Sequence, residues 1–314
     1  MLNGCLKEFD LGIFYMKFED CYRALEKLNA EYLKLENSSE LKVGKIIKVV
    51  LSMNVWRIYA CVVSAIRARK IKNVELSSSV AYSRGAFVDD DKKVAVYSCI
   101  TGKYDVMSSP LLIDDQLDYY LISDVDSKVD SVWTHLSIPL DATKYGGGMV
   151  NRFCKLNPWI YFQNYDYSIY VDGNIEIVSD IRSLCSLARD SKIGIAMHLH
   201  DSRDCVYKER DVCKLYKRGN AEAIDKQLNK FRAEGFPEHF GMVEATIIIV
   251  DLKNETAKKI MSAWWSELEC SNSGRDQISF PYVLWKNGYR IEDVGCLGNN
   301  RRKNPKFRTK SHGG

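Results

Sequence analysis

The chain has few of the features that mark secreted, membrane-spanning or disordered proteins. Its ten cysteines, in 314 residues, form no CxxC pair and no regular framework. Such spacing favours reduced thiols in the cytoplasm over a disulfide scaffold. The N-terminal residues lack a basic region followed by an apolar run, so no signal peptide is expected. Only six prolines occur and 46% of the residues are hydrophobic, which is typical of a globular fold.

Several enzyme signatures are also missing. There is no HExxH pair and no Gly-x-Ser-x-Gly elbow, which argues against a zinc protease and a serine hydrolase. Three glycines at 146–148 lack the Lys-Ser/Thr of a P-loop, so we interpret them as a hinge or lid rather than a phosphate cradle.

Long apolar runs are absent too. The most apolar stretch, residues 46–66, is interrupted by Lys48, Asn54 and Arg57. Each charge near the centre of a membrane span costs roughly 2.5–3.5 kcal/mol. We therefore expect a helix that packs on the domain or lies at a membrane surface, and no span. The second alternative adds a peripheral membrane contact and places the protein at the inner face of the membrane.

The net charge of +4 is concentrated in one segment. Residues 297–314 contain six basic residues and no acid, which leaves the rest of the chain slightly acidic. A body that binds nucleic acid is therefore not indicated. We interpret this segment as a basic, solvated C-terminal tail, with a phosphate-facing or membrane-facing tail as the alternative.

The residue pattern changes near position 90. Residues 1–72 predict helices, and the polar segment 73–91 is the best boundary. We expect a helical arm and linker over 1–90, an α/β domain over 91–296 and the tail over 297–314. Five strands are predicted at residues 94–99, 117–123, 167–171, 193–197 and 245–250. Five helices are predicted at residues 150–157, 178–190, 221–234, 255–269 and 276–287.

Polar side chains follow the predicted strands, where ligands bind in parallel sheets. Thr101-Gly-Lys-Tyr-Asp105 follows the first strand, and Asp124 follows the second. Asp172-Gly-Asn174 follows the third, and its carboxylate and amide oxygens suit Mg²⁺ or Mn²⁺. The same Asp-Gly-Asn pattern also forms metal-free turns, so both interpretations stay open.

Two further groups of residues suggest chemistry. Arg152 and Lys155 lie three apart in a predicted helix, so they share one face and suit a diphosphate. His198, His200 and Asp201 support a rival hypothesis, a metal-dependent hydrolase, although no second histidine cluster or cysteine pair completes a zinc site.

Eight motifs, taken in order, resemble the TOD/MUCI-type glycosyltransferase-like family between Val94 and Tyr289. They are Tyr97-Ser-Cys-Ile-Thr-Gly-Lys-Tyr-Asp105, Trp133, Asn151-Arg-Phe-Cys-Lys155, Tyr170-Val-Asp-Gly-Asn-Ile175, Arg203-Asp-Cys-Val-Tyr-Lys-Glu209, Gly241-Met-Val-Glu244, Trp264-Trp265 and Arg275-Asp-Gln-Ile-Ser-Phe280. The resemblance implies a GT-A-like, Rossmann-like fold: a mixed, mostly parallel sheet flanked by helices. It also implies an enzyme that builds surface or capsular polysaccharide.

The resemblance implies roles for individual residues. Nucleotide contacts fall to Thr101, Gly102, Tyr104, Asp105, Arg152 and Lys155. Asp172 and Asn174 occupy the metal position, where asparagine replaces the second aspartate of the DxD motif and lowers the expected metal affinity. Catalytic roles fall to Asp172, Glu244, Asp276 and Gln277. Donor or acceptor sugar contacts fall to His200, Arg203, Glu209, Trp265 and Arg275, although a Trp pair is more often core.

We therefore expect a hexosyltransferase that uses a nucleotide sugar, with a UDP-sugar favoured, and Mn²⁺ or Mg²⁺. The acceptor would be a glycan or a lipid-linked glycan. An inverting route would need a general base such as Glu244 or Asp276, whereas a retaining route would need none. A non-catalytic glycan-binding relative is the remaining alternative, and Arg152, Lys155 and Asp172 count against it.

Overall fold

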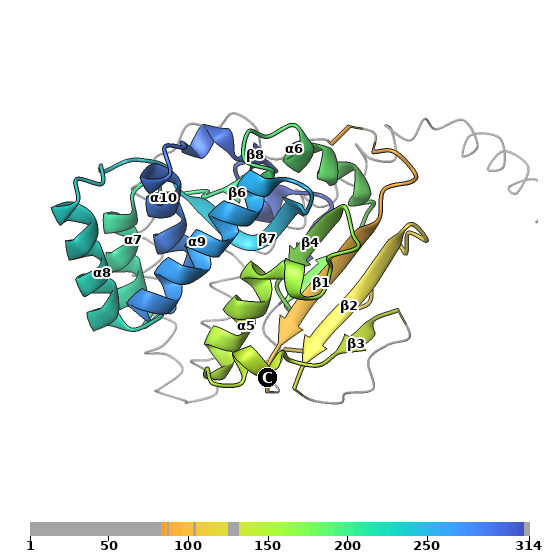
Figure 1. Cartoon of the computed structure of the whole chain (residues 1–314), viewed down its shortest axis with the longest axis horizontal. Coiled ribbons are helices and arrows are strands. Elements are labelled where there is room, and N and C mark those ends of the chain that lie inside the picture. Colours follow the sequence, from red (N-terminus) through yellow and green to blue (C-terminus); the bar gives the residue numbers. More distant parts are fainter. Residues whose placement is uncertain (1–82, 84, 87, 103–104, 125–131, 311–314) are drawn as a thin grey trace, which may run out of the picture. The chain divides into compact units, whose positions relative to one another are not determined.

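The computed structural model describes residues 83, 85–86, 88–102, 105–124 and 132–310 (Figure 1). The predicted N-terminal helical arm, most of the linker, Tyr104 and residues 311–314 lie outside the described residues. So does the apolar stretch 46–66. Among the helices that the structure describes, none is long and apolar enough to cross a membrane.

Seven strands form one sheet in the order β3-β2-β1-β4-β7-β6-β8. Their bounds are β1 (Val94–Ile100), β2 (Leu117–Ser123), β3 (Thr134–Leu136), β4 (Tyr167–Val171), β6 (Ile195–Leu199), β7 (Val243–Asp251) and β8 (Gly295–Cys296). Neighbouring strands pair in parallel, except that β7 runs antiparallel to both β4 and β6. The expected mixed, mostly parallel sheet is confirmed.

Helices flank the sheet, as expected (Figure 1). They are α5 (Gly147–Leu156), α6 (Cys185–Arg189), α7 (Val206–Leu215), α8 (Ala221–Ala233), α9 (Glu255–Ser271) and α10 (Asp276–Lys286). Five short 3₁₀ turns are described: η1 (Leu140–Ala142), η2 (Pro158–Ile160), η3 (Arg182–Leu184), η4 (Ile291–Asp293) and η5 (Arg301–Lys303). Asn220 and Asn254 begin α8 and α9, because each side chain accepts two backbone N–H groups of the first turn.

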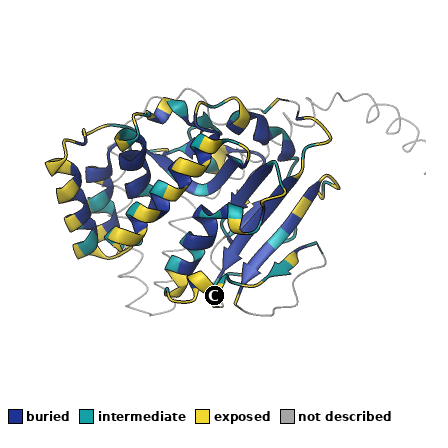
Figure 2. Ribbon diagram, viewed as in Figure 1, coloured by how far each residue is buried: buried dark blue, intermediate teal, exposed yellow. Residues whose placement is uncertain are grey.

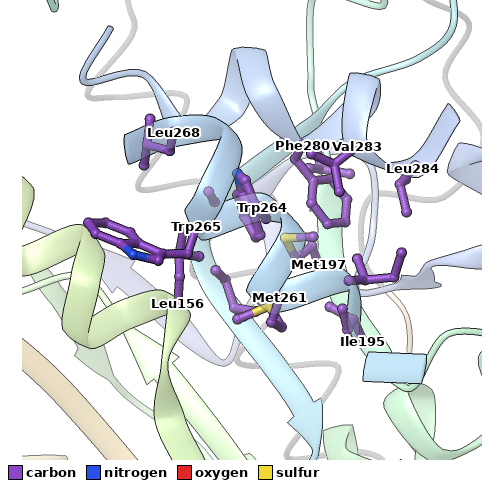
Figure 3. Packing of buried hydrophobic residues seen from close by; sticks show 14 of the residues in the cluster. Leu156, Ile195, Met197, Met261, Trp264, Trp265, Leu268, Phe280, Val283 and Leu284 are labelled. Atoms are coloured by element: carbon purple, nitrogen blue, oxygen red, sulfur yellow. The ribbon is translucent and has the colours of Figure 1, made fainter. Parts of the chain in front are cut away.

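Each face of the sheet covers a separate apolar core. Alternate residues of β1 point to opposite faces, so the whole strand is buried (Figure 2). On one face Tyr97 packs with residues of α5 and α7–α10, and Figure 3 shows Trp264 and Phe280 inside this core. On the other face Val96 packs with residues of α6. This double burial explains why the strands read as continuous apolar runs.

The segment 178–190 differs from its prediction as one helix. It contains only η3 and the five-residue α6. The Asp180 side chain accepts the backbone N–H of Arg182, which starts a turn there. Val178 instead donates its N–H to the carbonyl of Lys306, which holds its chain extended.

The basic C-terminal segment differs most from expectation. Its described part, up to residue 310, is packed into the fold and is not a solvated tail. Strand β9 (Phe307–Thr309) pairs antiparallel with β5 (Ile175–Ile177), and Phe307 is buried. The positive charges are neutralised locally, because Arg301 pairs with Glu244 and Arg308 pairs with Glu176. Neutralised cations do not need solvent, so a basic run can be part of a folded domain.

Candidate functional site

A cavity of about 940 Å³ opens where the strands end. Strands β1, β4 and β6 end at this edge, and the reversed β7 begins there. The predicted site residues that line the cavity are Thr101, Asp105, Arg152, Lys155, Asp172, Asn174, His200, Arg203, Glu244, Arg275, Asp276 and Gln277. Residues far apart in the sequence thus meet in one place, as the strand-end rule predicts.

Three predicted contact residues do not line the cavity. Gly102 is part of the loop after β1, and its N–H donates to both carboxylate oxygens of Asp124, at 2.8 and 3.0 Å. Glu209 is buried below the surface. Trp265 packs edge-on against Tyr145 and Phe153, so it is a core residue and stacks on no sugar in the cavity. Tyr104 is outside the described residues.

The Asp172-Gly-Asn174 turn is held firmly on both sides. A Cβ on Gly173 would lie 2.8 Å from Cδ1 of Ile100, so glycine allows this turn to press against the end of β1. Lys310 donates its N–H to the carbonyl of Asn174 at 2.9 Å, next to the β5–β9 pair. The turn is therefore part of the cavity wall and not a loose surface hairpin.

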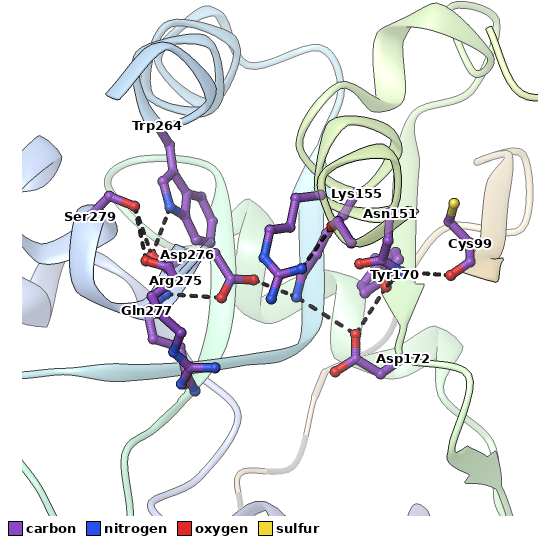
Figure 4. A network of polar contacts seen from close by, with 12 residues as sticks. Cys99, Asn151, Lys155, Tyr170, Asp172, Trp264, Arg275, Asp276, Gln277 and Ser279 are labelled. Carbon is purple, nitrogen blue, oxygen red and sulfur yellow. Dashed lines mark hydrogen bonds and ion pairs between the residues drawn. The ribbon is translucent and has the colours of Figure 1, made fainter. Parts of the chain in front are cut away.

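The centre of the cavity is a network of polar contacts around Lys155 (Figure 4). Its ammonium group lies 2.9 Å from Oδ2 of Asp276 and 3.6 Å from Oδ1 of Asp172. Tyr170 donates its hydroxyl proton to Oδ1 of Asp172 at 2.9 Å. Asn151 donates to the Tyr170 hydroxyl and to the carbonyl of Cys99. Residues of α5, β4 and α10 are thereby tied together.

Arg152 and Lys155 both face the cavity, but their surroundings differ. Lys155 is almost fully buried, whereas Arg152 donates to the carbonyl of Gly148 at 2.7 Å, in the first turn of α5. Gly146 caps this helix, and Gly147 and Gly148 line the cavity. The three glycines that we interpreted as a hinge or lid therefore form a helix N-terminus, which presents free N–H groups to anions.

Opposing effects set the charge of Asp276. Burial alone would raise the pKa of this carboxyl, but the charges of Lys155, Arg152 and Arg275, with the hydrogen bond from Lys155, lower the pKa well below its ordinary value. Asp276 is therefore ionised at neutral pH and serves as a fixed negative charge. A group with so low a pKa is a poor proton acceptor.

Glu209 joins two arginines beneath the cavity surface. Only 1% of its side chain is exposed. It forms an ion pair with Nε of Arg203, and Arg275 donates to its Oε1 at 3.2 Å. Arg275 also donates to Oε1 of Gln277 at 2.9 Å. Glu209 thus positions two residues of the wall and does not itself contact a ligand there.

The three residues of the hydrolase hypothesis do not converge. His198 is fully buried and bonds to Asn304 at 2.8 Å, on a different side from His200. Glu244 takes its place: the ligand atoms of His200, Asp201 and Glu244 all lie within 4.8 Å of one another. His200 follows Leu199, the last residue of β6, so the alternation of the strand does not fix the direction of its side chain.

Two sets of side chains in the cavity are of metal-ligating types. At His200, Asp201 and Glu244 two ligand atoms are already engaged, because Arg203 donates to Nε2 of His200 at 2.8 Å and Arg301 donates to Glu244. Asp172 fits a divalent cation better, because its second oxygen points away from Lys155 and Tyr170 (Figure 4). Asn174 adds an amide oxygen, so the pair offers the oxygen ligands that Mg²⁺ and Mn²⁺ prefer.

Some residues of the cavity were not predicted. Arg301 and Arg302 line it from η5, and Arg218 lines it from the segment after α7. The basic run at 301–303 was visible in the sequence but was assigned to a tail. Asn151 belongs to one of the eight motifs of the family resemblance, but the resemblance implies no role for it. In the structure it links β1 to Tyr170.

Buried His198 leads to a prediction on acid stability. Burial, with the charge of Arg301, lowers its pKa from 6.5 to about 3. The unfolded chain therefore binds a proton below pH 6.5 that the folded chain does not. The contribution of His198 to the free energy of unfolding is fully present above pH 6.5. Below that pH it falls by about 1.4 kcal/mol per pH unit until the pKa of the folded state is reached. We expect His198→Gln to remove this contribution, measured as a flatter dependence of Tm on pH between 7 and 4.5.

The exposed His239 provides the matched control for this effect. His239→Gln should leave the acid dependence of the wild-type protein in place. Equal slopes for wild type and His198→Gln would contradict the assignment.

Comparison with known proteins gives one family match. Residues 143–294 match the model of the TOD1/MUCI70, glycosyltransferase-like domain. No relative is found among the curated proteins.

Solved structures similar to this chain include three glycosyltransferases. Mouse xyloside xylosyltransferase 1, in its apo form, shares 12% identity and a TM-score of 0.37, covering 63% of this chain and 82% of that one. Galactosyltransferase LgtC, in complex with donor and acceptor sugar analogues, has 10% sequence identity and a TM-score of 0.36, and the match covers 60% of this chain and 70% of that one. Mannosyltransferase Ktr4p from S. cerevisiae has 12% sequence identity and a TM-score of 0.36, and the match covers 75% of each chain. These likenesses are loose, and no functional conclusion rests on them.

Proposed function

Because residues 143–294 of this chain match the model of the TOD1/MUCI70, glycosyltransferase-like domain, we propose that the protein transfers a hexose-type sugar from a nucleotide sugar to a glycan acceptor. A UDP-sugar is the proposed donor. The observation that carries the proposal is the convergence of Arg152, Lys155, Asp172 and Asp276 in one cavity at the strand ends. Cations and metal-ligating oxygens side by side suit a leaving nucleoside diphosphate.

The nucleotide is assigned to the side of the cavity formed by β1 and α5. Thr101 and Asp105 come from the loop after β1, and Thr101 donates its hydroxyl proton to the carbonyl of Gly147 at 3.0 Å. Asp124 holds the backbone of this loop through Gly102. The glycine-rich start of α5 lets phosphate oxygens approach the helix N-terminus closely.

The leaving diphosphate is assigned to Arg152 and Lys155. The buried Lys155 is fixed between two carboxylates, so its charge needs little reorganisation during the reaction. Such preorganised charges stabilise a developing anion more strongly than water does. A Mn²⁺ or Mg²⁺ ion held by Asp172 and Asn174 would supply further charge neutralisation at the diphosphate.

Of the two proposed bases, Asp276 is better suited to electrostatic support because its pKa is lowered. Glu244 lies at the start of β7, and its carboxylate accepts from Nε of Arg301 at 2.8 Å. We assign Glu244 and Gln277 to contacts with the sugars. Arg203 and Arg275, which Glu209 positions, and the neighbouring His200 complete this part of the site.

The cellular role is proposed on the family resemblance alone. We propose that the protein acts in the cytoplasm, at the inner face of the membrane, on a glycan or a lipid-linked glycan. In this proposal the protein takes part in the synthesis of a surface or capsular polysaccharide.

A thermal-shift screen tests the proposed function. Nucleoside diphosphates and nucleotide sugars are added with and without Mn²⁺, and Tm is measured. A ligand at 100 times its Kd stabilises by about 2.7 kcal/mol, so UDP and one UDP-sugar should raise Tm in a Mn²⁺-dependent manner. A flat response to every nucleotide would refute the proposal.

A further inference from the structure

The cavity contains a second group of cations apart from Arg152 and Lys155. Arg203 comes from the segment between β6 and α7, Arg218 from the segment after α7, and Arg275 from the residue before α10. We call these three residues the arginine wall. None of them comes from β1 or α5, which form the side assigned to the nucleotide.

The arginine wall is built with more positive than negative charge. Arg203 and Arg275 share the buried Glu209 as an ion-pair partner. The buried Asp276 also lies near Arg275, but its ion pair is with Lys155. Arg218 lies over the ring of Tyr216, 5.2 Å from its centroid, and has no acidic partner within the described residues. With Asp276 paired to Lys155, the three guanidinium groups share one ion-paired carboxylate, that of Glu209, among the described residues.

Two of these guanidinium groups are also largely desolvated. The side chains of Arg203 and Arg275 are only 11% and 12% exposed. Among the described residues, Nε of Arg275 is a buried donor that has no hydrogen-bond partner. A cation with a spare donor in a partly dry site gains strongly from an anionic ligand.

Arg275 is held in place and directed away from the diphosphate side. A Cβ on Gly219 would lie 2.7 Å from Cγ of Arg275, so glycine at this position lets the stem of Arg275 lie against the backbone. Gly219 has a φ of +72°, which other residues rarely adopt. The guanidinium group donates to Glu209 and Gln277. Figure 4 draws no contact between Arg275 and Asp172.

We propose that the arginine wall recognises an oxyanion on the acceptor sugar, so that the acceptor is an acidic glycan. This inference rests on the proposed transferase function and names the substrate class. The oxyanion is a carboxylate, as in a uronic acid, or a phosphate on a sugar hydroxyl. Planar guanidinium groups bind either one in a bidentate manner, whereas a neutral hexose offers no charge to them.

The test measures binding of matched monosaccharides by saturation-transfer NMR with UDP and the diamagnetic Mg²⁺ at saturating concentration, so that the nucleotide side is filled. The probes differ only at C6: glucose, glucuronate and glucose 6-phosphate, and the same three forms of galactose. At least one acidic form should bind on the order of tenfold more tightly than its neutral counterpart. The preferred form identifies carboxylate or phosphate as the ligand group.

Variants separate the arginine wall from the nucleotide side. Arg218→Glu changes an exposed residue, so the fold is preserved, and it should remove the preference for the acidic sugar. Arg203→Lys keeps the charge but not the bidentate geometry, and it should weaken that preference. Arg189→Glu, an exposed residue of α6 that does not line the cavity, is the control and should leave the preference unchanged.

Two results would overturn this inference while the proposed function stands. One is UDP binding together with equal binding, or no binding, of acidic and neutral sugars. The other is an equal loss of UDP and acidic-sugar affinity in Arg218→Glu, which would assign the arginine wall to the donor. If UDP itself does not bind, the proposed function fails as well.

Discussion

Replacing Asp172 by asparagine is expected to lower turnover of the selected donor by roughly 10²–10³-fold, the range seen when one preorganised electrostatic group is removed from an active site. The amide still accepts the hydroxyl proton of Tyr170, so the turn should keep its geometry. It loses the negative charge that a divalent cation requires and that faces Lys155. Turnover is measured as UDP release from the donor that the thermal-shift screen identifies.

Asp190→Asn is the matched control for this variant. Asp190 is exposed at the end of α6, and within the described part of the chain its ion pair is with its neighbour Arg189. It should retain full turnover. Both variants should have nearly the same Tm, because the side chain of Asp172 is 35% exposed and most surface substitutions change stability little. Unchanged turnover in Asp172→Asn would remove this residue from the mechanism.

The second large effect concerns folding stability. Lys155→Met should destabilise the protein by about 3–5 kcal/mol, because it leaves the buried carboxylate of Asp276 without its closest cation. A loss of this size lowers Tm by roughly 2–4 °C per kcal/mol in a domain of 150–250 residues. The measurement is urea unfolding of both proteins at neutral pH.

The pH dependence of this loss tests its cause. In the wild-type protein the pKa of Asp276 is lowered, so the stability from its charge is present above the ordinary carboxyl pKa and is lost only in strong acid. Without Lys155, burial raises that pKa and the carboxyl becomes neutral at a higher pH. The deficit of Lys155→Met should therefore shrink as the pH falls.

Two variants separate the effect of the unpaired carboxylate from the loss of a lysine as such. Lys192→Met removes an exposed lysine that pairs with Asp293, and it should change the free energy of unfolding by less than about 0.5 kcal/mol. Adding Asp276→Asn to Lys155→Met should restore part of the lost stability, because the unpaired charge is then absent. A deficit that is the same at pH 7.5 and 4.5 would point to lost packing instead.

The main strands could be predicted because their signal is local. Strand β1 lies between two apolar cores, so all its residues are buried and form a continuous apolar run. The prediction of residues 94–99 differs from β1 by one residue. Strands β5 and β9 have only three residues each, and their existence depends on pairing across the chain. No local pattern reveals such a pair.

In the candidate site, the residues that follow a locally recognisable strand were predictable, and those placed by long-range contacts were not. Asp172 and Thr101 follow recognisable strands, and the geometry of parallel sheets brings them together. Arg301 could not be placed, because its contact with Glu244 spans 57 positions and depends on how β8 returns to the sheet. His198 was misplaced because it belongs to β6 and packs against Asn304, whereas His200 lies past the end of that strand, and the sequence does not show where the strand ends.

The reversed direction of β7 has a consequence for how this protein can diverge. Because β7 begins where its neighbours end, its first residues, from Glu244 to Thr246, line the cavity, while the segment after it, with Lys253, lies at the opposite edge of the sheet. Substitutions in this first part of β7 would alter which acceptors the cavity admits. Changes after it would alter only how α9 is attached. Specificity and scaffold can therefore evolve separately within one strand and its two connections.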